Sequence, residues 1–64
     1  IEWIAALPGD ERRVLVMAFG LDGHGPRTLA QMSLAMGVSV ASVARTKRRA
    51  LERGRRLAAQ ASAA

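Results

Sequence analysis

Glycine and proline divide the chain into short segments, and this punctuation constrains the fold more than any other feature of the sequence. The breaks fall at Pro8-Gly9, at Gly20, at residues 23–26 and at Gly37. Elsewhere β-branched residues are sparse, whereas Ala, Leu and Arg are abundant, a composition that favours helices over strands. We therefore expect a small all-α domain whose helices end at these breaks.

The first half of the chain predicts two helices. Residues 1–7 are mostly apolar and suit one or two helical turns before the break at Pro8-Gly9. Asp10 is then a suitable N-cap, because its carboxylate can accept backbone N–H groups of the following turn. From there apolar residues recur every three to four positions, and Gly20 stands where a C-terminal helix glycine belongs.

The second half predicts two more helices, so four are expected in all. Residues 21–27 form a loop, and Thr28 caps a helix that extends up to Gly37. A tight turn follows. Ser39 then caps the last helix, which runs from about Val40 into the Ala-rich end of the chain.

A chain of 64 residues holds at most one domain. We expect that domain at residues 1–57, followed by an Ala-rich helix end or tail at residues 58–64 that frays. The chain begins at Ile1 rather than at Met, so we expect it to be a fragment or an excised domain. No apolar run approaches ~20 residues, and no membrane-spanning helix is expected.

The sequence offers little to catalysis or to metal binding. It has no Cys, which excludes disulfides and thiolate zinc sites, and His24 is its only histidine. Because no serine has a histidine partner with plausible geometry, nucleophilic catalysis has no support. We therefore expect no enzyme activity, no catalytic or metal site and no cofactor.

Positive charge is concentrated in the last helix. Ten Lys and Arg residues oppose five Asp and Glu residues, which gives a net charge of +5. The segment 45–56 contains one acid, Glu52, and seven basic residues: Arg45, Lys47, Arg48, Arg49, Arg53, Arg55 and Arg56. A one-signed cluster of this density predicts an anionic partner, which is nucleic acid, an acidic protein or an anionic membrane surface. A solvated helix face has the same composition and stays open as the alternative.

A helical projection separates the last helix into two faces. Within an arc of ~80° lie the residues expected to face the core, namely Val43, Thr46, Ala50, Gly54 and Leu57. The opposite side carries Arg45, Arg48, Arg49, Arg55 and Arg56. The helix is therefore expected to present a basic outward ridge, and Gly54 is expected to loosen or bend it.

The two segments on either side of the second tight turn predict a helix-turn-helix, in which the second helix is basic. Leu29 and Met32 would hold the first helix on the core, and Ser33 is small where the two helices approach. Val38 and Val43 are apolar and would lock the second helix. An ordinary helical hairpin in a small bundle has the same periodicity and remains the alternative.

Five short motifs follow one another in a characteristic order. They are Leu7-Pro8, Glu11-Arg12-Arg13-Val14-Leu15, Phe19-Gly20-Leu21-Asp22-Gly23, Arg27-Thr28-Leu29 and Gly37-Val38-Ser39. This pattern resembles region four of the primary-class, sigma-seventy-type bacterial sigma factors, from about Ile4 to Arg56. The resemblance implies a helix-turn-helix domain that binds the upstream (minus-thirty-five) promoter element. It also implies docking on the flap tip of the RNA polymerase β subunit, and contacts with anti-sigma or activator proteins.

The last helix departs from the family pattern. Where the family has Arg-Glu-Arg after the turn, this sequence has Val40-Ala41-Ser42, and Ala44 and Arg45 replace an Arg-Gln pair. Alanine cannot hydrogen-bond to base edges, so base contacts are expected from Ser42, Arg45 and Arg48. The full set of candidate DNA-binding residues is Thr28, Ser39, Ser42, Arg45, Lys47, Arg48, Arg49 and Arg55.

Apolar side chains of the preceding helices indicate a second, protein-binding site. The candidates are Val14, Met17, Ala18, Leu21 and Met36, with Met32 and Leu34 beside them. Methionine adapts well to a partner helix. The simpler interpretation is that these residues form the core, as Trp3 is also expected to do.

The sequence therefore predicts a bacterial transcription-initiation module, monomeric on its own and located in the cytoplasm at the nucleoid. Its expected partners are double-stranded promoter DNA and the β flap tip. Two alternatives stay open. A protein-interaction domain that reads no bases fits the missing Arg-Glu-Arg. A stand-alone regulator of the LuxR type fits the helix-turn-helix, but the loop motif at residues 19–23 speaks against it.

Overall fold

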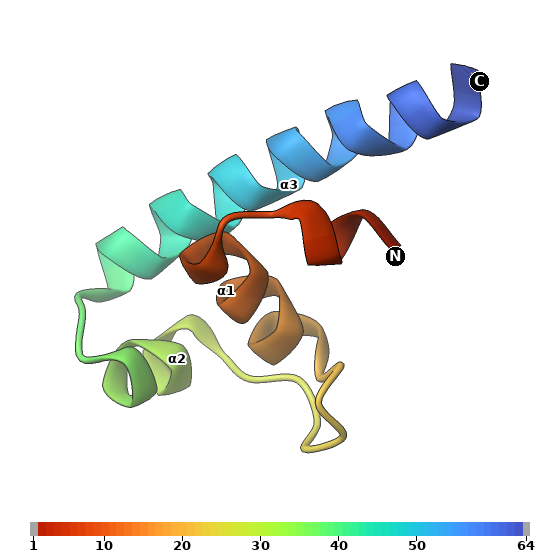
Figure 1. Cartoon of the computed structure of the whole chain (residues 1–64). Helices are drawn as coiled ribbons and strands as arrows, with labels where there is room; N and C mark the ends of the chain where they lie inside the picture. The colour runs from red at the N-terminus through yellow and green to blue at the C-terminus, as the bar shows by residue number, and fades with distance from the viewer. Residues whose placement is uncertain (1, 64) are drawn as a thin grey trace.

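The computed structural model describes the backbone of residues 2–63 and the side chains of residues 3–60. The chain forms a 3-10 helix, η1 (Glu2–Ala6), and three α-helices, α1 (Gly9–Phe19), α2 (Leu29–Met36) and α3 (Val40–Ala63). No strand occurs within residues 2–63. The expected all-α fold, with a short N-terminal helix and a long C-terminal one, is confirmed (Figure 1).

The longest element, α3, runs along the whole molecule, and η1, α1 and α2 pack beneath it (Figure 1). Its 24 residues correspond to ~36 Å of helix, close to the longest extent of the molecule, 39 Å. The fraying expected at residues 58–64 stays a prediction, because α3 continues to Ala63 and Ala64 lies outside the described residues. Within the described part, no helix has the length and apolar character needed to cross a membrane.

Glycines and a threonine end and begin the helices where the sequence predicts. Gly20 and Gly37 adopt the left-handed conformation, with φ of 67° and 70°, so their N–H groups can satisfy carbonyls of the preceding turn. Thr28 Oγ1 accepts the N–H of Gln31 at 3.1 Å, and Gln31 Oε1 accepts the N–H of Thr28 at 2.9 Å. This capping box fixes the start of α2.

The N-cap predicted at Asp10 is wrong. Helix α1 begins at Gly9, and the carbonyl of Pro8 already accepts the N–H of Arg12 at 2.9 Å. Asp10 therefore lies inside the first turn, where its Oδ1 accepts the N–H of the next residue, Glu11, at 2.9 Å. Its negative charge still complements the positive end of the α1 dipole.

The core has two parts, and both α1 and α3 contribute to each. The first contains Ile4, Leu7, Leu15 and Ala50, with Trp3, Val16, Leu51 and Leu57 packed against it. The second contains Val14, Met17, Met32 and Val43, with Ala18, Leu29 and Met36 packed against it. Val43 and Ala50 are fully buried, which confirms the inward face predicted for α3. That helix is held at two places along its length, so its outward face is carried on a fixed support.

Trp3 packs where α3 has no side chain. A Cβ at Gly54 would overlap the Trp3 ring, at 2.6 Å from Cη2, so glycine allows the indole to lie against the helix backbone. Helix α3 continues through Gly54 without a break, and the loosening or bend expected there stays a prediction. The expectation that Trp3 is a core residue is confirmed by its packing against the first part of the core.

Candidate nucleic-acid interface

Hydrogen bonds in the turn between α2 and α3 fix where α3 starts. Ser33 Oγ donates to the carbonyl of Val38 at 2.5 Å, which ties the turn back to α2. Ser39 Oγ accepts the N–H of Ser42 at 3.0 Å, which confirms Ser39 as the cap of α3. The small side chain predicted at Ser33 therefore also supplies a hydroxyl that closes the turn.

Packing beneath the turn joins α2 to α3. Met32 and Val43 are 1% and 0% exposed and lie in the same part of the core, with Leu29 packed against them. The prediction that Val38 locks the second helix is wrong, since its side chain is 41% exposed. The turn is held through the backbone of Val38, which leaves its side chain outside the core. With this correction, α2 and α3 form the predicted helix-turn-helix.

The outward face of α3 has a shallow, open depression. Ser42, Arg45, Arg48 and Arg49 line it. The three arginines are exposed, and the Arg49 guanidinium lies 3.5 Å from Thr46 Oγ1. Three guanidinium groups around one depression can together bind an anion, because each presents several N–H donors in a fixed plane.

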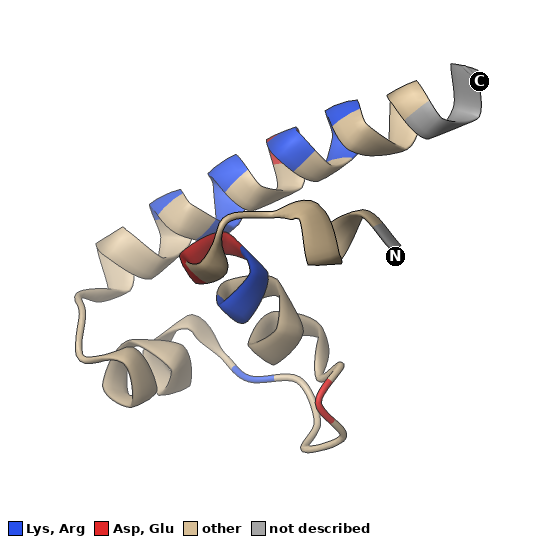
Figure 2. Cartoon of the chain, in the orientation of Figure 1, with Lys and Arg blue, Asp and Glu red and all other residues tan. Residues whose placement is uncertain are grey.

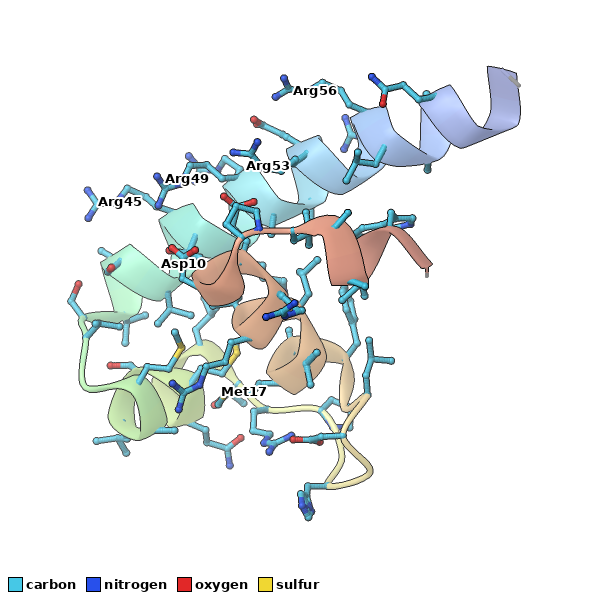
Figure 3. The ribbon with its side chains drawn as sticks, in the orientation of Figure 1. Asp10, Met17, Arg45, Arg49, Arg53 and Arg56 are labelled. Carbon is cyan, nitrogen blue, oxygen red and sulfur yellow. The ribbon has the colours of Figure 1, made fainter. Side chains whose placement is uncertain are left out.

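Basic side chains continue beyond the depression. Figure 2 shows that Lys and Arg residues follow α3 along much of its length. Figure 3 shows Arg45, Arg49 and Arg56 on the side of α3 that faces away from α1 and α2. Arg55 is exposed as well. The basic outward ridge predicted from the helical period is therefore present.

Arg53 differs from the other arginines because it is paired with a buried acid. Arg53 Nε donates to Glu11 Oε1 at 2.9 Å, and Nη2 approaches Oε2 at 3.4 Å. The Glu11 side chain is only 6% exposed, whereas that of Arg53 is 50% exposed. The pair joins α1 to α3, so its loss would leave a buried carboxylate without a partner.

The Glu11–Arg53 pair was not expected from the sequence. A signal was available, because Glu11 precedes Val14 and Leu15 by three and four residues and so shares their inward face. The partner could not be identified from the helical period, since Arg53 lies 42 residues further along the chain.

Three other candidate DNA-binding residues have partners within the chain. Lys47 Nζ lies 5.9 Å from the centre of the Phe19 ring, which brings it toward the end of α1 rather than into the depression. Thr28 and Ser39 use their oxygens as caps. A capping hydroxyl retains its own proton as a donor, so both residues can still bind a phosphate.

The apolar residues proposed for partner binding divide into two groups. Val14 and Met17 are 0% and 8% exposed and belong to the core, as does Met32. Their assignment to a binding groove is wrong, because α1 is covered by both α2 and α3 at these positions. Figure 3 labels Met17 near the C-terminal end of α1.

The remaining apolar candidates retain surface. Ala18 and Met36 are half-buried, and Leu21 is 44% exposed. Phe19, which the sequence reasoning did not select, is 49% exposed beside the end of α1. Leu34 is 86% exposed on α2. Outside α3 and the turn before it, the large apolar side chains exposed to a partner are therefore Phe19, Leu21 and Leu34 among the described residues.

The loop between α1 and α2 is closed by an ion pair. Arg27 donates from Nη1 and Nη2 to the two carboxylate oxygens of Asp22 at 2.8 and 2.7 Å, and the His24 N–H donates to Asp22 Oδ1 at 3.1 Å. These donors, the guanidinium first, hold the pKa of Asp22 well below its usual range. The same carboxylate raises the pKa of Arg27. The loop thus folds back toward α1, and a Cβ at Gly20 would collide with Gly25.

The chain matches a known protein family over most of its length. The family described as Sigma-70, region 4, matches residues 3–56. This range contains α1, α2 and the part of α3 that carries the depression and the arginines around it. No curated protein and no solved structure matches the chain significantly.

Proposed function

The chain belongs to the Sigma-70, region 4 family, and from this membership we propose that α3 binds the upstream element of bacterial promoters. This family consists of DNA-binding domains of transcription factors and is not an enzyme family. The observation that carries the proposal is the cluster of Ser42, Arg45, Arg48 and Arg49 around one depression on the outward face of α3. A domain that binds promoter DNA in this way acts at the bacterial nucleoid.

The support given to α3 suits a helix that enters a groove. Its inward side is buried at Val43 and Ala50, and Ser39 caps its start, so the arginines are displayed on a backbone that needs no rearrangement. An α-helix fits the major groove of B-form DNA, where arginine can donate two hydrogen bonds to guanine. Arginines further along the helix are suited to phosphates.

Salt dependence tests the electrostatic part of the proposal. If the ridge neutralises about four to six phosphates, log K should fall with log salt at a slope of about −4 to −5. The measurement is a titration of duplex DNA at several salt concentrations. A flat dependence, or no binding at low salt, would contradict DNA binding.

Two arginine variants separate base contacts from phosphate contacts. Arg45→Ala should lose about 1–3 kcal/mol of discrimination between sequences if Arg45 contacts guanine. Arg55→Ala, further along α3, should weaken binding to all sequences about equally. Selection from a random duplex library with each variant measures both effects. Identical patterns of loss would show that Arg45 contacts only the backbone.

Docking on the tip of the polymerase β flap is a second candidate function. The observation that favours it is the exposure of two large apolar side chains, Phe19 and Leu21, at the end of α1. Apolar side chains of this size support binding of an amphipathic helix. The same surface would serve an anti-sigma or activator protein, without the arginines that line the depression on α3.

A further inference from the structure

The outward side of α3 carries an exposed apolar surface next to the arginines. Val40 is 46% exposed, Ala41 is exposed and Ala44 is half-buried. Ala44 follows Ala41 by three residues and Val40 by four, so the three side chains are neighbours on the helix surface. This methyl surface, made of Val40, Ala41 and Ala44, has no side-chain hydrogen-bond donor or acceptor.

Two of the three residues of the methyl surface adjoin a cationic side chain. Arg45 follows Ala41 by four residues, and Arg48 follows Ala44 by four, so a guanidinium lies one turn beyond each of these two alanines. Both arginines line the depression. An occupant of this combined surface must be strongly anionic and must present apolar groups at one end. In the major groove of DNA, the phosphates and the C5-methyl groups of thymine meet both conditions.

We propose that Val40, Ala41 and Ala44 recognise thymine methyl groups, so that the domain selects thymines beside the base pair contacted by Arg45. This inference rests on the proposed function, in which α3 enters the major groove. Selection arises because methyl groups are removed from water on both sides of the contact. Burial of one methyl group should strengthen binding about fourfold.

Uracil substitution tests methyl recognition directly. Uracil has the same hydrogen-bonding groups as thymine and lacks only the C5-methyl group. A preferred duplex is first selected from a random library with the chain itself. Each thymine of that duplex is then replaced in turn by deoxyuridine, and affinity is measured at low salt. We expect about a fourfold loss at the thymines that contact the methyl surface and no change at the others.

Two variants and one matched control assign the effect to residues. Val40→Thr replaces a methyl group by a hydroxyl, and Ala41→Ser adds a hydroxyl to the methyl carbon, each at an exposed position. Both should abolish the uracil penalty at one thymine. Ala59→Ser makes the same change as Ala41→Ser on the same face of α3, about five turns and ~27 Å away. It should leave the penalty unchanged. Circular dichroism checks that each variant keeps its helices.

The outcomes distinguish this inference from the function on which it rests. Selective DNA binding that is insensitive to every uracil substitution would overturn methyl recognition and leave DNA binding intact. A uracil penalty that persists in Ala41→Ser and Val40→Thr would also overturn it, because other residues would then contact the methyl groups. Absence of salt-dependent DNA binding would overturn both proposals.

Discussion

At Gly54, the usual effect of a glycine-to-alanine change in a helix should be reversed. Alanine is normally favoured by about 1 kcal/mol in a helix interior, but a Cβ at Gly54 overlaps the ring of Trp3. Overpacking of this kind costs about 1–3 kcal/mol. We therefore expect Gly54→Ala to lower the free energy of unfolding by about 1 kcal/mol, measured by urea denaturation followed by circular dichroism.

A smaller residue at position 3 provides the control. In a Trp3→Leu background the added methyl group has room, so Gly54→Ala should raise the free energy of unfolding by about 1 kcal/mol. Stabilisation by Gly54→Ala in both backgrounds would mean that the indole is not the reason for glycine at this position.

Single residues also show how far the sequence alone determines the structure. The caps at Thr28 and Ser39 were predicted correctly, because each depends on atoms within three residues along the chain. The roles of Gly54 and Glu11 depend on partners more than 40 residues away, Trp3 and Arg53. Local pattern therefore does not reveal them.

At the scale of elements, the loop between α1 and α2 should make folding stability depend on pH. The pKa of Asp22 is lower in the folded chain than in the unfolded one, because Arg27 and the His24 N–H bind its carboxylate. The stabilisation is therefore complete above the unfolded pKa, about 3.9, and is lost as the pH falls below it. Asp22→Asn should lower the melting temperature at neutral pH.

The pH series supplies its own control. The difference in melting temperature between wild type and Asp22→Asn should shrink progressively as the pH falls from about 3.9 toward the lowered pKa of Asp22 in the folded chain. A difference in melting temperature that stays constant across the series would show that the ion pair with Arg27 does not stabilise the loop.

In the candidate site, too, some features follow from the helical repeat of the sequence, whereas others depend on how the helices pack together. The outward position of the arginines on α3 follows from the helical period, and the structure confirms it. The burial of Val14 and Met17 does not follow from that period, because it requires knowing that α2 and α3 both cover α1. A repeat of apolar residues every three to four positions is the same for a core face and for a binding groove.

For the molecule as a whole, the docking function should be separable from DNA binding. Leu21→Asp places a charge on the exposed apolar surface at the end of α1 and should weaken binding to the polymerase β flap tip by about tenfold or more. Leu34→Asp is the matched control, because Leu34 is the more exposed residue and lies on α2. Calorimetric titration of the flap tip with each variant gives the comparison.

Both leucine variants should bind duplex DNA as the wild type does, since neither changes α3. An equal loss of flap binding in Leu21→Asp and Leu34→Asp would contradict a docking surface centred on Phe19 and Leu21. Met17→Asp is unsuitable for this purpose, because Met17 is buried and a charge there would unfold the domain.

Helix α3 contributes to both parts of the core, and this determines when the chain can fold during its synthesis. The first part of the core closes on Ala50 and the second on Val43, and the buried Glu11 has its partner at Arg53. A nascent chain that has emerged only as far as α2 therefore holds apolar side chains with nothing to cover them. Folding must wait until most of α3 has left the ribosome, and synthesis of α3 takes on the order of seconds at ~5–20 residues per second. A chain truncated within α3 would be an unfolded chain, a ready substrate for proteases, rather than a weaker domain.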